Sequence, residues 1–427
     1  MSDRERAGAV LRGRRAGSEE RATEHRRNRT GPERPASSRS EAEATDTVWT
    51  DRVLELEVGP VAHGGHCVAR HEGRVVFVRH ALPGERVLAV VVEDGGGGFC
   101  RADAVAVREA APRRVPAPCV WARAGGCGGC DFQHADPALQ RELKAAVLAE
   151  QLRRLAGIER AVEVEVLPGG ALGWRHRVRL AVDEHGRPGL RAHRSHDVVP
   201  IADCPITPAG ALPPVLEHRF APGGEVEVVV DADGVVQAGG GPAVQRAVGR
   251  EWLLSPGVFW QVHPALPDAL ASVVAEWADA PAGGTAWDLY GGVGLFAAVL
   301  AGQVGPDGEV VVVESSARAV ADGRAALADL AQVGWRTGRV ERVLPDLDGR
   351  PDVVVADPPR RGLGRELVDA LCGRAPDRVV HVACDPAALA RDLALFTARG
   401  YRLDGLRAFD AFPMTHHFES VALLTLA

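Results

Sequence analysis

The last part of the chain contains four short apolar runs that alternate with stretches of helical pattern. The runs are residues 285–289, 309–313, 352–356 and 378–383. Strands that are apolar along their whole length must be buried on both faces, which is the condition of a parallel sheet covered by helices on either side. The sequence therefore predicts an α/β fold with a Rossmann-like, doubly wound sheet.

The chain of 427 residues is too long for one ordinary hydrophobic core. Residues 1–45 are rich in Arg, Glu, Ser and Gly and lack large apolar side chains, so we expect a disordered tail. Residues 46–110 hold short β-rich segments broken by glycine, which favours a small β-barrel. We expect a central mixed α+β domain over residues 111–250 and the Rossmann-like domain over residues 251–427.

Charge and apolar patterning limit the partners of this chain. The formal net charge is −7 and the pI about 6.1, so an RNA-binding surface would have to be a local basic patch. No apolar run has membrane-spanning length and no signal-peptide core is present, so we expect a cytoplasmic protein that contacts no membrane and acts as a monomer. Eight cysteines in a reducing compartment indicate metal binding or catalysis rather than disulfides.

Polar residues follow three of the predicted strands. A glycine-rich turn spans Asp288–Gly294, Glu314 ends the next run, and Asp357 follows the third. Ligands of doubly wound sheets bind beyond the carboxyl ends of the strands, whereas a lone glycine-rich turn often serves packing alone. A phosphate-binding GxGxxG motif is missing and the strand ends are acidic, which suits cationic S-adenosylmethionine better than an anionic dinucleotide.

Cys384 ends the fourth run, and by position alone it is as readily a buried, inert cysteine as a functional one. Its motif Cys384-Asp-Pro, together with Asp357-Pro-Pro-Arg, Phe259-Trp-Gln-Val-His-Pro and Phe412-Pro-Met-Thr-His-His-Phe-Glu-Ser, resembles the S-adenosylmethionine-dependent RNA 5-methyluridine methyltransferases. Residues 63–86 are similar to a TRAM domain, an oligonucleotide-binding-like barrel fused to RNA-modifying enzymes. Many relatives carry Cys or Ser where this chain has Gly291.

The resemblance implies a role for each matching residue. Cys384 would add as a thiolate to carbon-6 of uracil, and Glu419 would later remove the proton from carbon-5. Phe259 or Trp260 would either stack on a flipped-out base or pack in the core. The residues that match the family's S-adenosylmethionine contacts are Gln261, Tyr290, Glu314 and Asp357.

A second set of cysteines comprises Cys119, Cys127, Cys130 and the distant Cys204. By count, four thiolates hold zinc or an iron–sulfur cluster equally well. The Cys-Gly-Gly-Cys core with one remote ligand matches the family's [4Fe-4S] pattern. Such a cluster would be structural or would dock RNA, because methyl transfer needs no electron. The remaining cysteines, Cys67, Cys100 and Cys372, are expected to pack in the interior.

Three other functions compete with RNA uracil-5-methylation. Asp357-Pro-Pro also occurs in methyltransferases that act on exocyclic amines, but Arg360 stands where those enzymes have an aromatic residue. A catalytically silent RNA-binding cluster protein would not need Cys384 or Glu419. A radical enzyme with a TRAM domain would carry a Cys-x-x-x-Cys-x-x-Cys triplet, which is absent. The resemblance covers enzymes of both transfer RNA and large-subunit ribosomal RNA, and the predicted cluster favours 23S ribosomal RNA.

Overall fold

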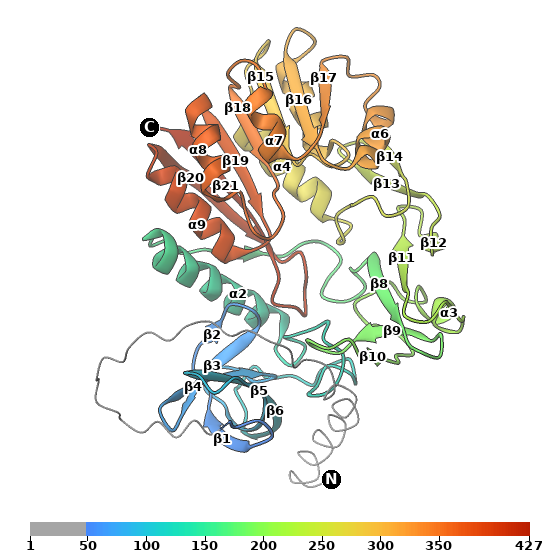
Figure 1. Cartoon of the computed structure of the whole chain (residues 1–427), viewed down its shortest axis with the longest axis vertical. Coiled ribbons are helices and arrows are strands. Elements are labelled where there is room, and N and C mark those ends of the chain that lie inside the picture. The colour runs from blue at the N-terminus through green and yellow to red at the C-terminus, as the bar shows by residue number, and fades with distance from the viewer. Residues whose placement is uncertain (1–47) are drawn as a thin grey trace, which may run out of the picture.

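The computed structural model describes residues 48–427, so the tail predicted for residues 1–45 lies outside the described residues. Within residues 48–427 the strands form four sheets (Figure 1). No helix in this range is long and apolar enough to cross a membrane.

The first sheet curls into a small barrel at the N-terminal end of the described chain (Figure 1). In its first strand, β1, Leu54 and Leu56 are buried, while the glutamates between and beside them are exposed. This alternation is typical of a strand with one buried face. The strand order is β1-β5-β6-β4-β3-β2. The strands are β1 (Val53–Glu57), β2 (Val61–Ala62), β3 (His66–His71), β4 (Arg74–Arg79), β5 (Arg86–Asp94) and β6 (Phe99–Glu109).

A middle region follows the barrel. An irregular cysteine-bearing loop, residues 110–136, leads into helix α2 (Pro137–Gln151). Asp136 caps this helix by accepting from Leu139 N at 2.9 Å. The helix continues as a π-helical turn, η2 (Leu152–Ala156). A five-stranded sheet has the order β10-β9-β8-β11-β12, and β13-β14 form a separate hairpin. These elements are β8 (Arg177–Val182), β9 (Pro188–Arg191), β10 (Val198–Val199), α3 (Pro213–Leu216), β11 (Glu225–Val230), β12 (Val236–Ala238), β13 (Ala243–Ala247) and β14 (Arg250–Leu254).

The largest sheet has eight strands in the order β17-β16-β15-β18-β19-β21-β20-β7. Strands β15 to β19 pair in parallel, whereas β21 runs antiparallel to both β19 and β20. The short β7, from the middle region, adds to the edge through β20. The strands are β7 (Val164–Glu165), β15 (Thr285–Leu289), β16 (Glu309–Glu314), β17 (Val333–Thr337), β18 (Val353–Ala356), β19 (Arg378–Ala383), β20 (Tyr401–Phe409) and β21 (Glu419–Leu426).

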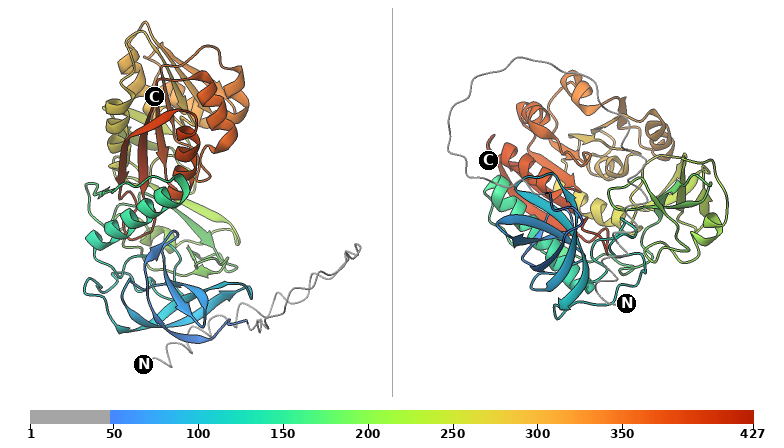
Figure 2. Two further views of the ribbon diagram at one scale, coloured as in Figure 1. Left: turned by 90° about the vertical axis from the view of Figure 1, so that its left-hand side faces the viewer. Right: turned by 60° about the horizontal axis from the view of Figure 1, so that its bottom comes forward.

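Helices cover both faces of this sheet (Figure 2). The sheet separates two hydrophobic cores, and neighbouring residues of β15 face different ones. Ala286 lies in the first core and Trp287 in the second, and both are fully buried. The first core includes α4 (Leu266–Ala278), α5 (Leu295–Val304) and α6 (Ala317–Ala326). The second includes η2, α7 (Val340–Val343), η3 (Leu344–Asp346), α8 (Gly364–Arg374) and α9 (Pro386–Thr397). The predicted α/β class with a doubly wound, Rossmann-like sheet is confirmed.

Candidate active site

Cys384 and Glu419 lie side by side at the carboxyl edge of the large sheet. Cys384 directly follows β19, and Glu419 is the first residue of β21. The two strands pair antiparallel with Ala383 opposite Ser420, so the strand order brings together residues that are distant in sequence. The predicted nucleophile and the predicted base thus share one short stretch of the sheet edge.

The surroundings of Cys384 oppose ionisation of its thiol. Burial, helped by the carboxylates of Glu419 and Asp357 and opposed by Arg360, raises the pKa of Cys384 to about 12. At neutral pH the thiol therefore holds its proton in the ligand-free protein. The sequence placed Arg360 in the motif Asp357-Pro-Pro-Arg but did not indicate that its charge acts on Cys384.

Glu419 is 5% exposed. Burial raises its pKa well above the ordinary range of a glutamate, the nearby Asp357 adds to this, and Arg360 opposes it. Its Oε2 has no hydrogen-bond partner among the described residues. Glu419 is thus a carboxyl group with an unusually high proton affinity, which is the property that a general base needs close to neutral pH.

The barrel reaches the residue next to Cys384. Asp385 caps helix α9 by accepting from Ala388 N at 2.7 Å, and its other oxygen lies 3.1 Å from Nε2 of His63. His63 belongs to the turn between β2 and β3 of the barrel. No local sequence signal identifies this contact, because the two residues come from opposite ends of the described chain.

The acidic strand ends form the neighbouring part of the edge. Glu314 Oε2 accepts from Gly292 N at 3.1 Å, and Oε1 accepts from Ser316 N at 2.6 Å. These contacts fix the carboxylate and leave lone pairs for a further donor, since a carboxylate has about four acceptor positions. Tyr290 follows β15 with a φ of 61°, and its hydroxyl lies 3.5 Å from Glu341. Burial raises the pKa of Asp357 to about 6.

Asp288 is a site residue that the sequence showed only as the start of the glycine-rich turn. It is fully buried, and its Oδ2 accepts from Ala297 N at 2.9 Å while Oδ1 has no partner within residues 48–427. Burial raises its pKa to about 8, helped by Asp357 and Glu314. A Cβ at Gly291 would lie 2.8 Å from Asp288 Oδ2, so the glycine at this position leaves room for the carboxylate.

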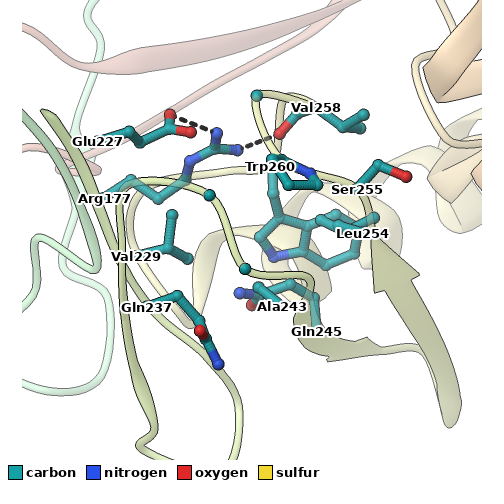
Figure 3. Close-up of a pocket in the computed structure, with 14 residues that line it drawn as sticks. Arg177, Glu227, Val229, Gln237, Ala243, Gln245, Leu254, Ser255, Val258 and Trp260 are labelled. Atoms are coloured by element: carbon teal, nitrogen blue, oxygen red, sulfur yellow. Dashed lines mark hydrogen bonds and ion pairs between the residues drawn. The ribbon is translucent and has the colours of Figure 1, made fainter. Parts of the chain in front are cut away.

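The segment Phe259–Gln261 precedes α4, and within it Trp260 lines a pocket of about 360 Å³ (Figure 3). Arg177 spans this pocket, donating to Glu227 at 2.7 Å and to the carbonyl of Val258 at 2.6 Å. Trp260 is 5% exposed and packs on Trp252 with ring centroids 5.3 Å apart, whereas Phe259 is 63% exposed. Trp260 is therefore a core residue, and Phe259 is the aromatic side chain free to meet a ligand.

All four cysteines of the second set line one cavity of about 360 Å³ between the cysteine-bearing loop and the middle sheet. Gly129 N donates to Cys127 Sγ at 3.3 Å, and Arg175 lines the same cavity. Burial raises the pKa of Cys130 to about 12 and also raises the pKa values of Cys127 and Cys204. No group of three His, Cys, Asp or Glu side chains in the described range is arranged to hold a metal ion.

Comparisons with known proteins agree with this architecture. Residues 346–427, which include Cys384 and Glu419, match the family described as tRNA (Uracil-5-)-methyltransferase, and residues 51–105 match the TRAM domain. An uncharacterized RNA methyltransferase of Streptomyces avermitilis is 45% identical over 87% of this chain and 97% of its own. The 23S rRNA (uracil(1939)-C(5))-methyltransferase RlmD of Chromohalobacter salexigens is 33% identical over 93% of this chain and 94% of its own.

The chain belongs to the RNA (uracil-5-)-methyltransferase family. A solved structure supports the fold: the tRNA (uracil-54, C5)-methyltransferase of Pyrococcus abyssi, in complex with S-adenosyl-L-homocysteine, has a TM-score of 0.67 at 21% identity and covers 87% of this chain and all of its own. The predicted TRAM domain and class I methyltransferase fold are confirmed.

Proposed function

We propose that this methyltransferase methylates carbon-5 of a uridine in 23S ribosomal RNA through a covalent adduct with Cys384. The observation that carries the proposal is the pair formed by Cys384 and Glu419 at one edge of the sheet, with Glu419 buried and its pKa raised. Similarity to the protein named RlmD favours ribosomal RNA, and a tRNA uridine is the alternative.

The first step needs a nucleophile, because carbon-5 of uracil is too weak to take a methyl group unaided. Addition of the Cys384 thiolate to carbon-6 forms a carbon–sulfur bond and moves the electron pair of the C5=C6 bond onto the ring as an enolate. Since the pKa of Cys384 is about 12 in the ligand-free protein, its thiol must transfer its proton to water when the substrates bind. Arg360 favours that loss because its charge stabilises the thiolate.

S-adenosylmethionine, when bound, supplies an electrophilic methyl group on a positively charged sulfonium. The acidic strand ends suit that charge: the pKa of Asp357 is raised by burial, and a cation beside it restores the ionised form. Glu314, held in place by Gly292 and Ser316, has a free acceptor position for a ribose hydroxyl. We propose that Gln261, Tyr290, Glu314 and Asp357 form this binding site.

The last step is proton removal by Glu419. The carboxylate takes the carbon-5 proton, the electrons of that C–H bond re-form the C5=C6 double bond, and the C6–S bond breaks with its electrons returning to sulfur. The product leaves with its new methyl group, Cys384 is again a thiolate, and Glu419 carries the proton. Its raised pKa makes the ionised carboxylate a strong base for this abstraction.

We further propose that Cys119, Cys127, Cys130 and Cys204 hold a [4Fe-4S] cluster. All four line one cavity, and Gly129 N and Arg175 lie where they can stabilise thiolate sulfur. The cluster would cross-link the cysteine-bearing loop to Cys204 and take no part in methyl transfer. The TRAM barrel and the exposed Phe259 are the proposed contacts with RNA.

The proposal is tested with RNA from a strain that lacks the enzyme and a methyl-labelled cofactor. The wild-type protein should place label in large-subunit ribosomal RNA as 5-methyluridine, identified after digestion to nucleosides. Cys384→Ala should reduce labelling to background, because no thiolate can activate the ring. Cys372→Ala, which changes a half-buried cysteine of α8, is the matched control and should stay active. Label only in tRNA would favour the alternative, and full activity of Cys384→Ala would refute the mechanism.

A further inference from the structure

Glu419 depends on a loop that has no helix or strand of its own. We call residues 410–418, which join β20 to β21 and end directly before Glu419, the base loop. It extends from the large sheet towards α2 and the barrel (Figure 1). Because Glu419 Oε2 lacks a hydrogen-bond partner within the described chain, the position of its carboxylate must come from the backbone that carries it.

Helix α2 holds the first half of the base loop. Lys144, the single lysine of the chain, is 1% exposed and donates to Asp410 Oδ1 at 2.5 Å and to the carbonyl of Phe412 at 3.1 Å. Gln140, also on α2, accepts from Met414 N at 2.7 Å. These contacts fix the loop as far as its midpoint.

Asp131 holds the second half, which leads into Glu419. Its Oδ2 accepts from the ring nitrogen Nδ1 of His416 at 2.6 Å and from His416 N at 3.1 Å. The backbone N–H groups of Asp131 and Phe132 both donate to the carbonyl of Met414 at 2.9 Å. Asp131 is 7% exposed and directly follows Cys130, so it joins the cysteine-bearing loop to a residue three positions before Glu419.

The TRAM barrel also contacts the pair formed by Asp131 and His416. Arg79 Nη2, at the end of β4, lies 3.6 Å from Asp131 Oδ1. A Cβ at Gly65 would lie 2.9 Å from Asp131 Cβ and 3.1 Å from His416 Cβ, so the β2–β3 turn packs directly on the pair. Asp131 is therefore the point where the barrel, the cysteine-bearing loop and the base loop meet.

We propose that Asp131 is a positioning residue for proton removal: by anchoring His416 it holds the Glu419 carboxylate against carbon-5 of the adduct. The inference rests on the proposed function. It assigns Asp131 to the last step, because its hydrogen bonds go to the base loop, whereas the β2–β3 turn that packs on it reaches the Cys384 side only through His63 and Asp385.

The test separates formation of the methylated protein–RNA adduct from its decay by rapid quenching with a methyl-labelled cofactor. Asp131→Asn should form the adduct within about twofold of the wild-type rate and release product about tenfold more slowly, as expected when a charged hydrogen bond that aligns a reacting group is lost. His416→Ala breaks the same hydrogen-bonded pair by removing its more exposed partner. It should likewise slow product release without slowing adduct formation. Asp94→Asn is the matched control, since Asp94 is a buried carboxylate paired with Arg74 inside the barrel, and it should leave both rates unchanged.

Glu419→Gln serves as the reference for a stalled last step. Adduct decay at the wild-type rate in Asp131→Asn and His416→Ala, while Glu419→Gln accumulates adduct, would overturn the role of Asp131. Equal slowing of formation and decay, shared with Asp94→Asn, would also overturn it, because that pattern is general loss of structure. Absence of adduct in Glu419→Gln would instead refute the proposed mechanism itself.

Discussion

At the scale of single residues, the site is dominated by carboxyl groups that form no ion pair within residues 48–427. Asp288, Asp357 and Glu419 all have pKa values raised mainly by burial. Each of them costs folding free energy when it is ionised, because charge is poorly solvated in the interior. A cationic methyl donor reduces that cost on binding, so the ligand-free site is poised to accept positive charge.

Asp288 provides a test of this cost through pH. Its pKa is about 8 in the folded protein and about 4 in an unfolded chain, so the folded state binds the proton more tightly. The contribution of Asp288 to stability is therefore greatest below about pH 4 and is lost as pH rises through 8. Asp288→Asn keeps the acceptor for Ala297 N, so the ligand-free variant should be more stable than the wild type by at least ~1 kcal/mol at pH 9, with a smaller difference at pH 5.

Thermal unfolding of both proteins across this pH range measures the difference. A stability difference that does not change between pH 5 and pH 9 would contradict the raised pKa of Asp288.

At the scale of elements, most of the proposed catalytic and cluster-binding residues lie in or beside irregular loops. Helices and strands hold the two ends of each loop. Cys384 lies between β19 and α9, Glu419 follows the base loop, and three of the four clustered cysteines lie on one loop before α2. The cysteine-bearing loop is held by few regular contacts, such as the pairing of Cys127 with Ala192. A metal cluster would add a cross-link between this loop and Cys204.

The cysteine-bearing loop leads to a prediction on metal content. Protein purified without oxygen should carry about four irons per chain with matching sulfide. Cys204→Ser should lose most of this iron although Cys204 lies far from the other ligands in sequence, because all four cysteines line one cavity. Cys372→Ala should keep its iron. Stoichiometric zinc without iron, or full iron content in Cys204→Ser, would contradict the cluster proposal.

At the scale of the whole molecule, local patterns in the sequence were sufficient to predict the α/β fold class. The apolar runs identified β15, β16, β18 and β19, and the acidic residues after them fell on one edge of the sheet, as parallel strands require. The antiparallel insertion of β21 beside β19 has no local signal. The pairing of Cys384 with Glu419 was therefore expected only through the resemblance to a family.

Contacts between distant segments could not be predicted at all. Asp131 and His416 are 285 residues apart, and although His416 lies in the motif at residues 412–420, nothing in the sequence pairs it with Asp131. The burial of Lys144 has no sequence signal either, because burial of a charge depends on a partner such as Asp410 that only the fold supplies. The predicted domain limits, monomeric state and cytoplasmic location stay predictions.

The most direct measurement of the central claim is the fate of labelled methyl groups in Glu419→Gln. If Cys384 adds to carbon-6 and Glu419 removes the carbon-5 proton, this variant can still add and still accept the methyl group, but elimination stalls. It should accumulate a methylated protein–RNA adduct that survives denaturation and whose peptide maps to Cys384. Rapid turnover without any adduct, or an adduct on a different cysteine, would contradict the account.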